Sequence, residues 1–196
     1  MKSRRGPIED LPAKGRGLEN SEKPERTKEG ATNDPSRMRE KVAAAAFRIL
    51  AGRPQSERQL RDRLLSKPWV APEAVEHCIT RLKEMGYLND AQFAQNYASS
   101  RVGLKAIGRA RVARELAGKK VSQATIEEAL GSVFDEAGEE SVIDRAIQKR
   151  IRTHGRPSDR ASAKRMFDHL ARLGFEFSLI IRKLQALSAN VGDDDQ

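Results

Sequence analysis

The stretch LSKPWVAPEAVEHCITRL, residues 65–82, carries the apolar spacing that decides the fold. Counted from Leu65, apolar residues stand five, ten, fourteen and seventeen positions later. The same spacing recurs in LAGKKVSQATIEEALGSV, residues 116–133, and in LARLGFEFSLIIRKLQAL, residues 170–187. The copies begin 51 and then 54 residues apart. Recurrence with such a period is typical of an array of similar helical units.

From residue 38 onward the apolar spacing is helical nearly throughout, and no alternating run of β-branched residues indicates a strand. We therefore expect an all-α protein of three tandem three-helix repeats, stacked into an elongated, curved array that buries shared apolar stripes. The expected units are a disordered extension at 1–37, three repeats at 38–89, 90–134 and 135–188, and a flexible acidic tail at 189–196.

Capping and breaking residues predict where the helices begin and end. Ser56 and Gln59 have the spacing of a capping box, and Asn89 with Asp90 forms an N-cap pair. Gly174 is a C-cap signal. The expected helices span about 39–51, 57–66, 72–85, 90–107, 109–118, 123–134, 139–154, 159–173 and 176–188.

Positive charge is concentrated in one part of the chain. The net charge is +9, and residues 101–120 hold seven Lys and Arg against the single anion Glu115. Such a cluster indicates an anionic partner, of which nucleic acid is the usual one, although a solvated cationic face is the alternative. The candidate contacts with nucleic acid or with a protein–DNA filament are Arg101, Lys105, Arg109, Arg111, Arg114, Lys119 and Lys120.

The helix that follows Gly108 has cations in its first turn, where the helix macrodipole disfavours them. The corresponding helices of the other repeats open with Ser-Glu and Ser-Asp instead. A phosphate bound to free backbone N–H groups at this N-terminus would make Arg109 and Arg111 favourable. Together with Lys105 and Arg114, they are the contacts that we expect first.

No pattern predicts catalysis, a cofactor or a metal site. His77 and Cys78 are adjacent and point about 100° apart on a helix, and the other histidines have no ligand at a suitable spacing. The sequence has no run of 18 apolar residues, the length that a membrane-spanning helix needs. The single cysteine fits a reducing cytoplasm. The few aromatic residues fall mostly on helical stripes, so we expect them in the core and expect no base-stacking platform.

Two blocks resemble the RecX family of bacterial recombination regulators. The first is LKEMGYLNDAQFA, residues 82–94, and the second is KAIGRARVAREL, residues 105–116. The resemblance extends over about 40–187. Asn89 stands where an acidic residue is common in the family, but both residue types cap helices.

The resemblance implies a cytoplasmic, non-enzymatic modulator of the RecA recombinase, with three tandem three-helix repeats. It would bind in the groove of the RecA–DNA filament and limit strand exchange and coprotease activity. Contacts with single- and double-stranded DNA through the basic surface, no membrane association and a monomeric state are the further expectations. The alternatives are a stand-alone DNA-binding protein built from helix-turn-helix-like units and a helical nuclease.

Overall fold

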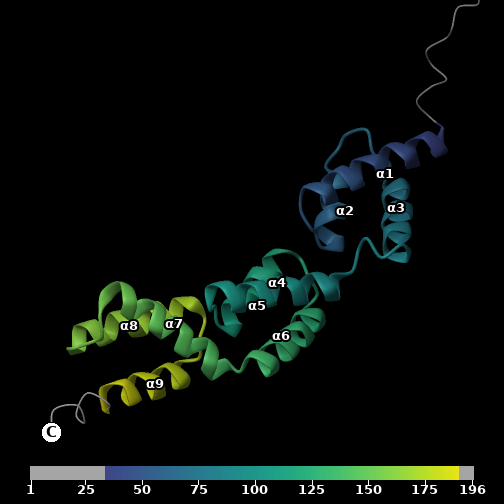
Figure 1. Cartoon of the computed structure of the whole chain (residues 1–196). Helices are drawn as coiled ribbons and strands as arrows, with labels where there is room; N and C mark the ends of the chain where they lie inside the picture. Colours follow the sequence, from purple (N-terminus) through teal and green to yellow (C-terminus); the bar gives the residue numbers. More distant parts are fainter. Residues whose placement is uncertain (1–33, 190–196) are drawn as a thin grey trace, which may run out of the picture. The chain divides into compact units, whose positions relative to one another are not determined.

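The computed structural model describes residues 34–189, which form nine α-helices and no strand (Figure 1). The all-α prediction is confirmed for these residues, while the elongated, curved shape stays a prediction. The expected extension up to residue 33 and the tail from residue 190 lie outside the described residues. In chain order the helices are α1 (Pro35–Gly52), α2 (Glu57–Leu65), α3 (Pro72–Glu84), α4 (Asp90–Lys105), α5 (Arg109–Gly118), α6 (Gln123–Ala137), α7 (Glu139–His154), α8 (Arg160–Leu173) and α9 (Phe177–Ala189).

Local signals in the sequence place most helix ends correctly. Ser56 caps α2 by accepting a hydrogen bond from the backbone N–H of Gln59 (3.2 Å), and the Gln59 side chain accepts one from Ser56 N–H (3.4 Å). Asn89 caps α4 through the N–H of Gln92 (2.9 Å). Gly174 ends α8 in the left-handed conformation, with φ of 88°.

The first helix begins earlier than expected. α1 starts at Pro35 rather than near residue 39, because Asp34 acts as its N-cap and accepts a hydrogen bond from Ser36 N–H (2.9 Å). Proline suits the first position of a helix, where no intrahelical donor is needed. Residues 35–37, expected in the disordered extension, are therefore helical.

The helices enclose two separate cores. Repeats two and three share one core, as expected for stacked units, but repeat one encloses a core of its own. The fully buried large side chains of the first core are Leu60, Leu64, Val42 and Val75, and those of the shared core are Leu116, Ile126, Ile143, Leu170, Ile180, Val102, Val112 and Val142.

The residues of the repeated apolar spacing are buried or partly buried, with one exception. Leu116 and Leu170 open their copies of the spacing and are fully buried, whereas Leu65 is 42% exposed. Its neighbour Leu64 takes the buried place. The spacing thus identifies the repeat correctly, but its first position is shifted by one residue in the first copy.

Repeats two and three meet at a close backbone contact between Gly108 and Gly174. Gly108 N–H donates to Leu173 O (2.9 Å), and Ala110 N–H donates to Gly174 O (3.2 Å). A Cβ on Gly108 would lie 2.5 Å from the carbonyl carbon and oxygen of Gly174. Only glycine allows the two backbones to approach so closely.

Repeats one and two meet through polar contacts instead. Ser56 is fully buried, and its Oγ donates to Lys119 O (2.5 Å). Asp90 Oδ1 accepts from the backbone N–H of Glu57 (2.8 Å), so it caps α2 of the preceding repeat. Burial raises the pKa of Asp90 despite this hydrogen bond.

The described part of the chain contains neither a membrane-spanning helix nor a cluster of metal ligands. None of its helices is both long and apolar enough to cross a bilayer. Within residues 34–189, no three His, Cys, Asp or Glu side chains gather where they could hold a metal ion.

Candidate nucleic-acid interface

The seven cations predicted as contacts fall on two helices and one turn. α4 supplies Arg101 and its last residue Lys105, α5 supplies Arg109, Arg111 and Arg114, and the turn before α6 supplies Lys119 and Lys120. Each must be compared with its surroundings, because a cation that already has a strong partner in the fold is less available to a phosphate.

Glu115 pairs with two of these cations. Arg101 holds the Glu115 carboxylate with both Nε (2.5 Å) and Nη2 (2.7 Å), and Arg111 Nε donates to it at 3.2 Å. The Tyr97 hydroxyl also donates to Glu115 (2.9 Å). The hydrogen bonds from Arg101 are the largest cause that lowers the pKa of Glu115 to about 2. This network ties α4 to α5.

Arg109 also has a structural role. Its guanidinium lies over the ring of Phe134 in α6, 5.4 Å from the centroid, and donates to Leu130 O at 3.3 Å. A cation on an aromatic face stabilises a packed pair of helices. Arg109 therefore joins α5 to α6.

The α5 N-terminus is occupied by the C-terminal end of α8. Ala110 N–H donates to Gly174 O (3.2 Å), Arg111 N–H donates to Gly108 O (3.2 Å), and Arg111 Nη1 donates to Arg172 O (3.4 Å). The prediction of free N–H groups for a phosphate is therefore wrong for Ala110 and Arg111. The cations sit here because the carbonyl end of α8 carries partial negative charge.

The two lysines of the α5–α6 turn contact neighbouring helices. Lys119 Nζ lies 4.7 Å from the ring centroid of Tyr97 and 6.0 Å from that of Phe93, both on α4. Lys120 Nζ forms an ion pair with Asp62 of α2. The Lys120 charge is not deeply buried, since half of its side chain is exposed.

Lys105 and Arg114 are the most available of the seven. Both are exposed, and among the described residues neither has a carboxylate partner. Arg114 donates only to Ala110 O (3.3 Å) within its own helix. It lines an open hollow of about 580 Å³ together with Arg172 of α8, a residue that no sequence pattern marks as a contact. Only the packing of α8 beside α5 brings these two arginines together.

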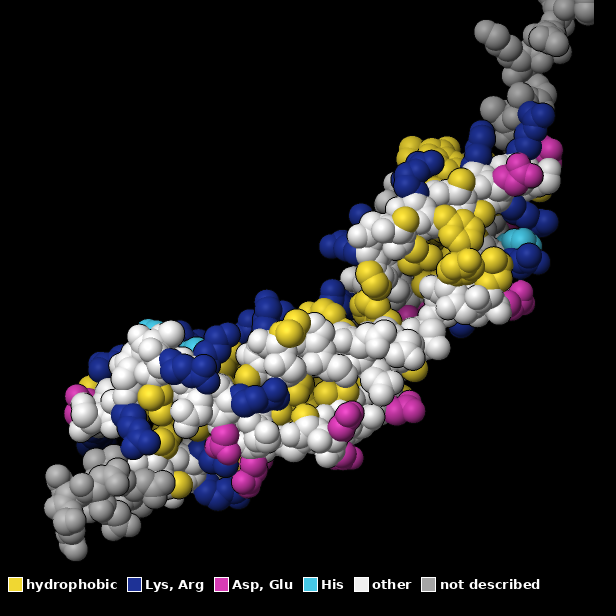
Figure 2. All heavy atoms as spheres, in the orientation of Figure 1, with side chains coloured by type: hydrophobic (Ala, Val, Ile, Leu, Met, Phe, Trp, Pro, Cys, Tyr) yellow, Lys and Arg dark blue, Asp and Glu magenta, His cyan; other side chains and the backbone are white. Residues whose placement is uncertain are grey.

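Charge is segregated on the surface. On the face shown in Figure 2, Lys and Arg side chains gather over α7 and α8, whereas Asp and Glu side chains lie along α6. The exposed acids of α6 are Glu127, Glu128, Asp135 and Glu136. An anionic partner is therefore favoured on the side of α5, α7 and α8 and disfavoured along α6.

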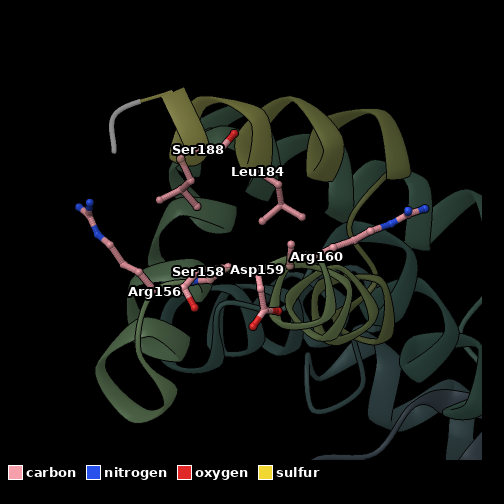
Figure 3. Close-up of a pocket in the computed structure, with 9 residues that line it drawn as sticks. Arg156, Ser158, Asp159, Arg160, Leu184 and Ser188 are labelled. Atoms are coloured by element: carbon pink, nitrogen blue, oxygen red, sulfur yellow. The ribbon is translucent and has the colours of Figure 1, made fainter. Parts of the chain in front are cut away.

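A hollow of about 320 Å³ between the α7–α8 loop and α9 is a poor candidate for an anion site (Figure 3). Leu184 points into it, but Arg156 and Arg160 direct their guanidinium groups away on opposite sides. The Asp159 carboxylate is used to cap α8 through Ser162 N–H (2.7 Å). This hollow therefore offers no converging positive charge.

The chain is similar to proteins of one family. A family model described as the second three-helix domain of RecX matches residues 89–130. The regulatory protein RecX of Streptomyces lividans is 32% identical over 157 residues, which cover 80% of this chain and 82% of that protein. RecX of Thermobifida fusca is 27% identical over 154 residues, covering 78% and 82%.

Solved structures share the fold. The crystal structure of RecX from Lactobacillus salivarius has a TM-score of 0.68 at 19% identity, and the match covers 79% of this chain and 99% of that one. Likeness at this identity concerns the three-helix repeats alone, while the relative with 32% identity shows the family. The chain therefore belongs to the RecX family of regulatory proteins and is a regulator rather than an enzyme.

Proposed function

We propose that this protein regulates the bacterial RecA recombinase, mainly as an inhibitor, by binding the RecA–DNA filament. The observation that carries the proposal is its membership of the RecX family, at 32% identity over 157 residues. Binding would limit strand exchange and coprotease activity, and so modulate recombination, DNA repair and the SOS response. The protein would act in the cytoplasm, as a monomer.

The surface supports contacts with single- and double-stranded DNA in the filament. Lys105 and Arg114 are exposed and lack carboxylate partners among the described residues, so we assign phosphate contacts to them first. The other five candidates, Arg101, Arg109, Arg111, Lys119 and Lys120, hold partners within the fold and would contribute chiefly to the positive field around the site.

The test is ATP hydrolysis by RecA that depends on single-stranded DNA, measured while this protein is titrated. A regulator of filament growth or persistence inhibits well below one molecule per RecA subunit. Inhibition that begins only when the protein coats the DNA would contradict the proposal.

A double charge reversal tests the contact surface. K105E/R114E should weaken inhibition strongly, because it turns two available cations into anions. The matched control is R39E/K41E, which makes the same charge change at two exposed positions of α1. Equal inhibition by K105E/R114E and by the control, with both variants folded by circular dichroism, would contradict the assignment of phosphate contacts to Lys105 and Arg114.

The net charge of +9 also supports a second candidate, a stand-alone DNA-binding protein. Such a protein would bind DNA with the same affinity in the presence and absence of RecA. A footprint on a defined DNA sequence without RecA would favour it. A steep salt dependence would not separate the two candidates, because each phosphate contact on single strands adds about 0.7 to the slope in either case.

A further inference from the structure

A groove lined by aromatic side chains lies where repeat one adjoins repeat two. It has a volume of about 860 Å³, within the range of ligand sites, and is formed by the end of α1, the α3–α4 turn and one face of α4. Its aromatic residues are Phe47, Tyr87, Phe93 and Tyr97. Of the seven candidate cations, Lys119 alone lines this groove.

The four aromatic rings of the groove form two pairs, and one of these pairs is exposed to solvent. Phe47 and Tyr87 meet edge to face, with centroids 5.3 Å apart and an angle of 90°, yet they remain 41% and 58% exposed. The expectation that the aromatic side chains lie in the core is therefore wrong for Phe47. The expectation of no base-stacking platform, which rested on it, no longer follows. Phe93 and Tyr97 lie one turn apart on α4, nearly parallel at 22°. Two half-buried rings thus adjoin two exposed ones.

The polar lining of the groove favours a negatively charged ligand whose rings can form hydrogen bonds. Its charged side chains are Arg53 and Lys119, and no carboxylate is among the lining residues. Lys119 Nζ stands 4.7 Å from the centroid of Tyr97, with no carboxylate partner in the described part of the chain. Uncharged donors and acceptors complete the wall and are Asn89, Gln92, Asn96 and Ser100.

We propose that this groove binds single-stranded nucleic acid by stacking bases on its aromatic side chains, with Arg53 and Lys119 facing the phosphates. Every base has a π-face, so aromatic platforms beside a positive groove suit single strands of any sequence. Duplex DNA keeps its bases stacked on one another and cannot use these rings. An acidic protein segment would match the charge and could pair with the amides, but it would offer few flat rings to stack on the four aromatic side chains.

The proposal deepens the proposed function, because it names the strand as the filament component held here. It is nevertheless testable without RecA. The test uses the full chain with a fluorescein-labelled dT20 oligonucleotide and with a duplex of 20 base pairs, measured by fluorescence anisotropy. The wild type should bind the single strand more tightly than the duplex.

The decisive variant is F47A/Y87A, which removes the two exposed rings and leaves both cores intact. Stacking contributes about fivefold or more in affinity per base, so loss of both rings should weaken dT20 binding about 25-fold or more. Binding of the duplex should be unchanged. The salt dependence should also be unchanged, whereas K119Q should lower the slope by about 0.7.

The matched control is L65A/W69A, which removes two large apolar side chains that are 42% and 43% exposed and lie outside the groove. It should bind dT20 like the wild type. A direct readout comes from Y87W in a W69F background, whose only tryptophan lies in the groove. Its fluorescence should be quenched by dT20 and not by the duplex.

Two results would overturn the proposal. One is a dT20 affinity of F47A/Y87A equal to that of the control, which would indicate that the groove binds a protein segment instead. The other is an equal loss of single-strand and duplex binding. If F47A/Y87A loses dT20 binding as expected but the protein does not affect RecA, the groove proposal holds and the proposed regulation fails. If RecA is inhibited while F47A/Y87A binds dT20 normally, the regulation stands and the groove proposal fails.

Discussion

Replacement of Gly108 by alanine should destabilise the contact between repeats two and three. An ideal Cβ there would lie 2.5 Å from the carbonyl carbon and oxygen of Gly174 and 2.6 Å from the nitrogen of Phe175. Ordinary van der Waals contact begins at about 3.5 Å, so the α8–α9 turn would have to move by about 1 Å. All three neighbours are backbone atoms, which cannot rotate out of the way.

The loss in free energy of unfolding can be worked out from the contacts that this movement disrupts. Overpacking of this kind costs about 1–3 kcal/mol. The shift would also lengthen the hydrogen bonds from Gly108 N–H to Leu173 O (2.9 Å) and from Ala110 N–H to Gly174 O (3.2 Å). Each such bond contributes about 0.5–1.5 kcal/mol to the free energy of unfolding. The expected loss is therefore about 2–6 kcal/mol, or a fall in Tm of at least about 4 °C.

The assay is thermal unfolding followed by circular dichroism, with G103A as the matched control. Gly103 lies near the end of α4, five positions before Gly108, and a Cβ there would meet nothing within 4 Å. Alanine in a helix is favoured over glycine by about 0.5–1 kcal/mol, so G103A should raise Tm. The two glycine-to-alanine changes are thus expected to have opposite signs. A G108A protein that melts at or above the wild-type temperature would refute the reasoning about the junction.

Three further predictions concern polar contacts. Because the pKa of Glu115 is lowered from 4.5 to about 2, its pairing with Arg101 stabilises the fold above pH 4.5 and is lost as pH falls towards 2. E115Q should therefore show a smaller fall in Tm over that window, and a fall equal to the wild type would contradict this. S56A should lose about 1–3 kcal/mol in urea unfolding, because it removes a buried cap and a hydrogen bond to the α5–α6 turn; a loss under 0.5 kcal/mol would count against it. R111E should lower Tm by a few degrees while R114E stays close to the wild type, since only Arg111 pairs with Glu115; equal melting temperatures would show that the two arginines have the same role.

Helix positions could be predicted from the sequence because their signals are local. The capping box of Ser56, the N-cap of Asn89 and the left-handed Gly174 each act within a few residues of the chain. The apolar spacing depends only on the helix period, so it identifies the repeats without any knowledge of how they pack. Its failure at Leu65, which is 42% exposed, shows the limit of a pattern with no tertiary information.

Partners distant in sequence could not be predicted in this way. Asp90 has the sequence context of an N-terminal helix residue, yet it caps α2, and its hydrogen-bond partner Glu57 lies 33 positions earlier. The closeness of Gly108 to Gly174 depends on how α8 packs beside α5. The exposure of Phe47 likewise depends on which helices cover α1, and nothing in its own helical stripe indicates it.

The cations of α5 illustrate why charge in a sequence does not by itself identify a binding surface. Arg109 and Arg111 look like phosphate ligands because they oppose the macrodipole of their own helix. In the fold, the α5 N-terminus meets the carbonyl end of α8, and Arg111 donates to Arg172 O at 3.4 Å. The partial charges of the two helix ends are thus opposed, and an arginine there stabilises the junction. Loss of filament binding in a variant of either arginine would reflect a damaged junction as readily as a lost phosphate contact, whereas loss at Lys105 or Arg114 would reflect the surface itself.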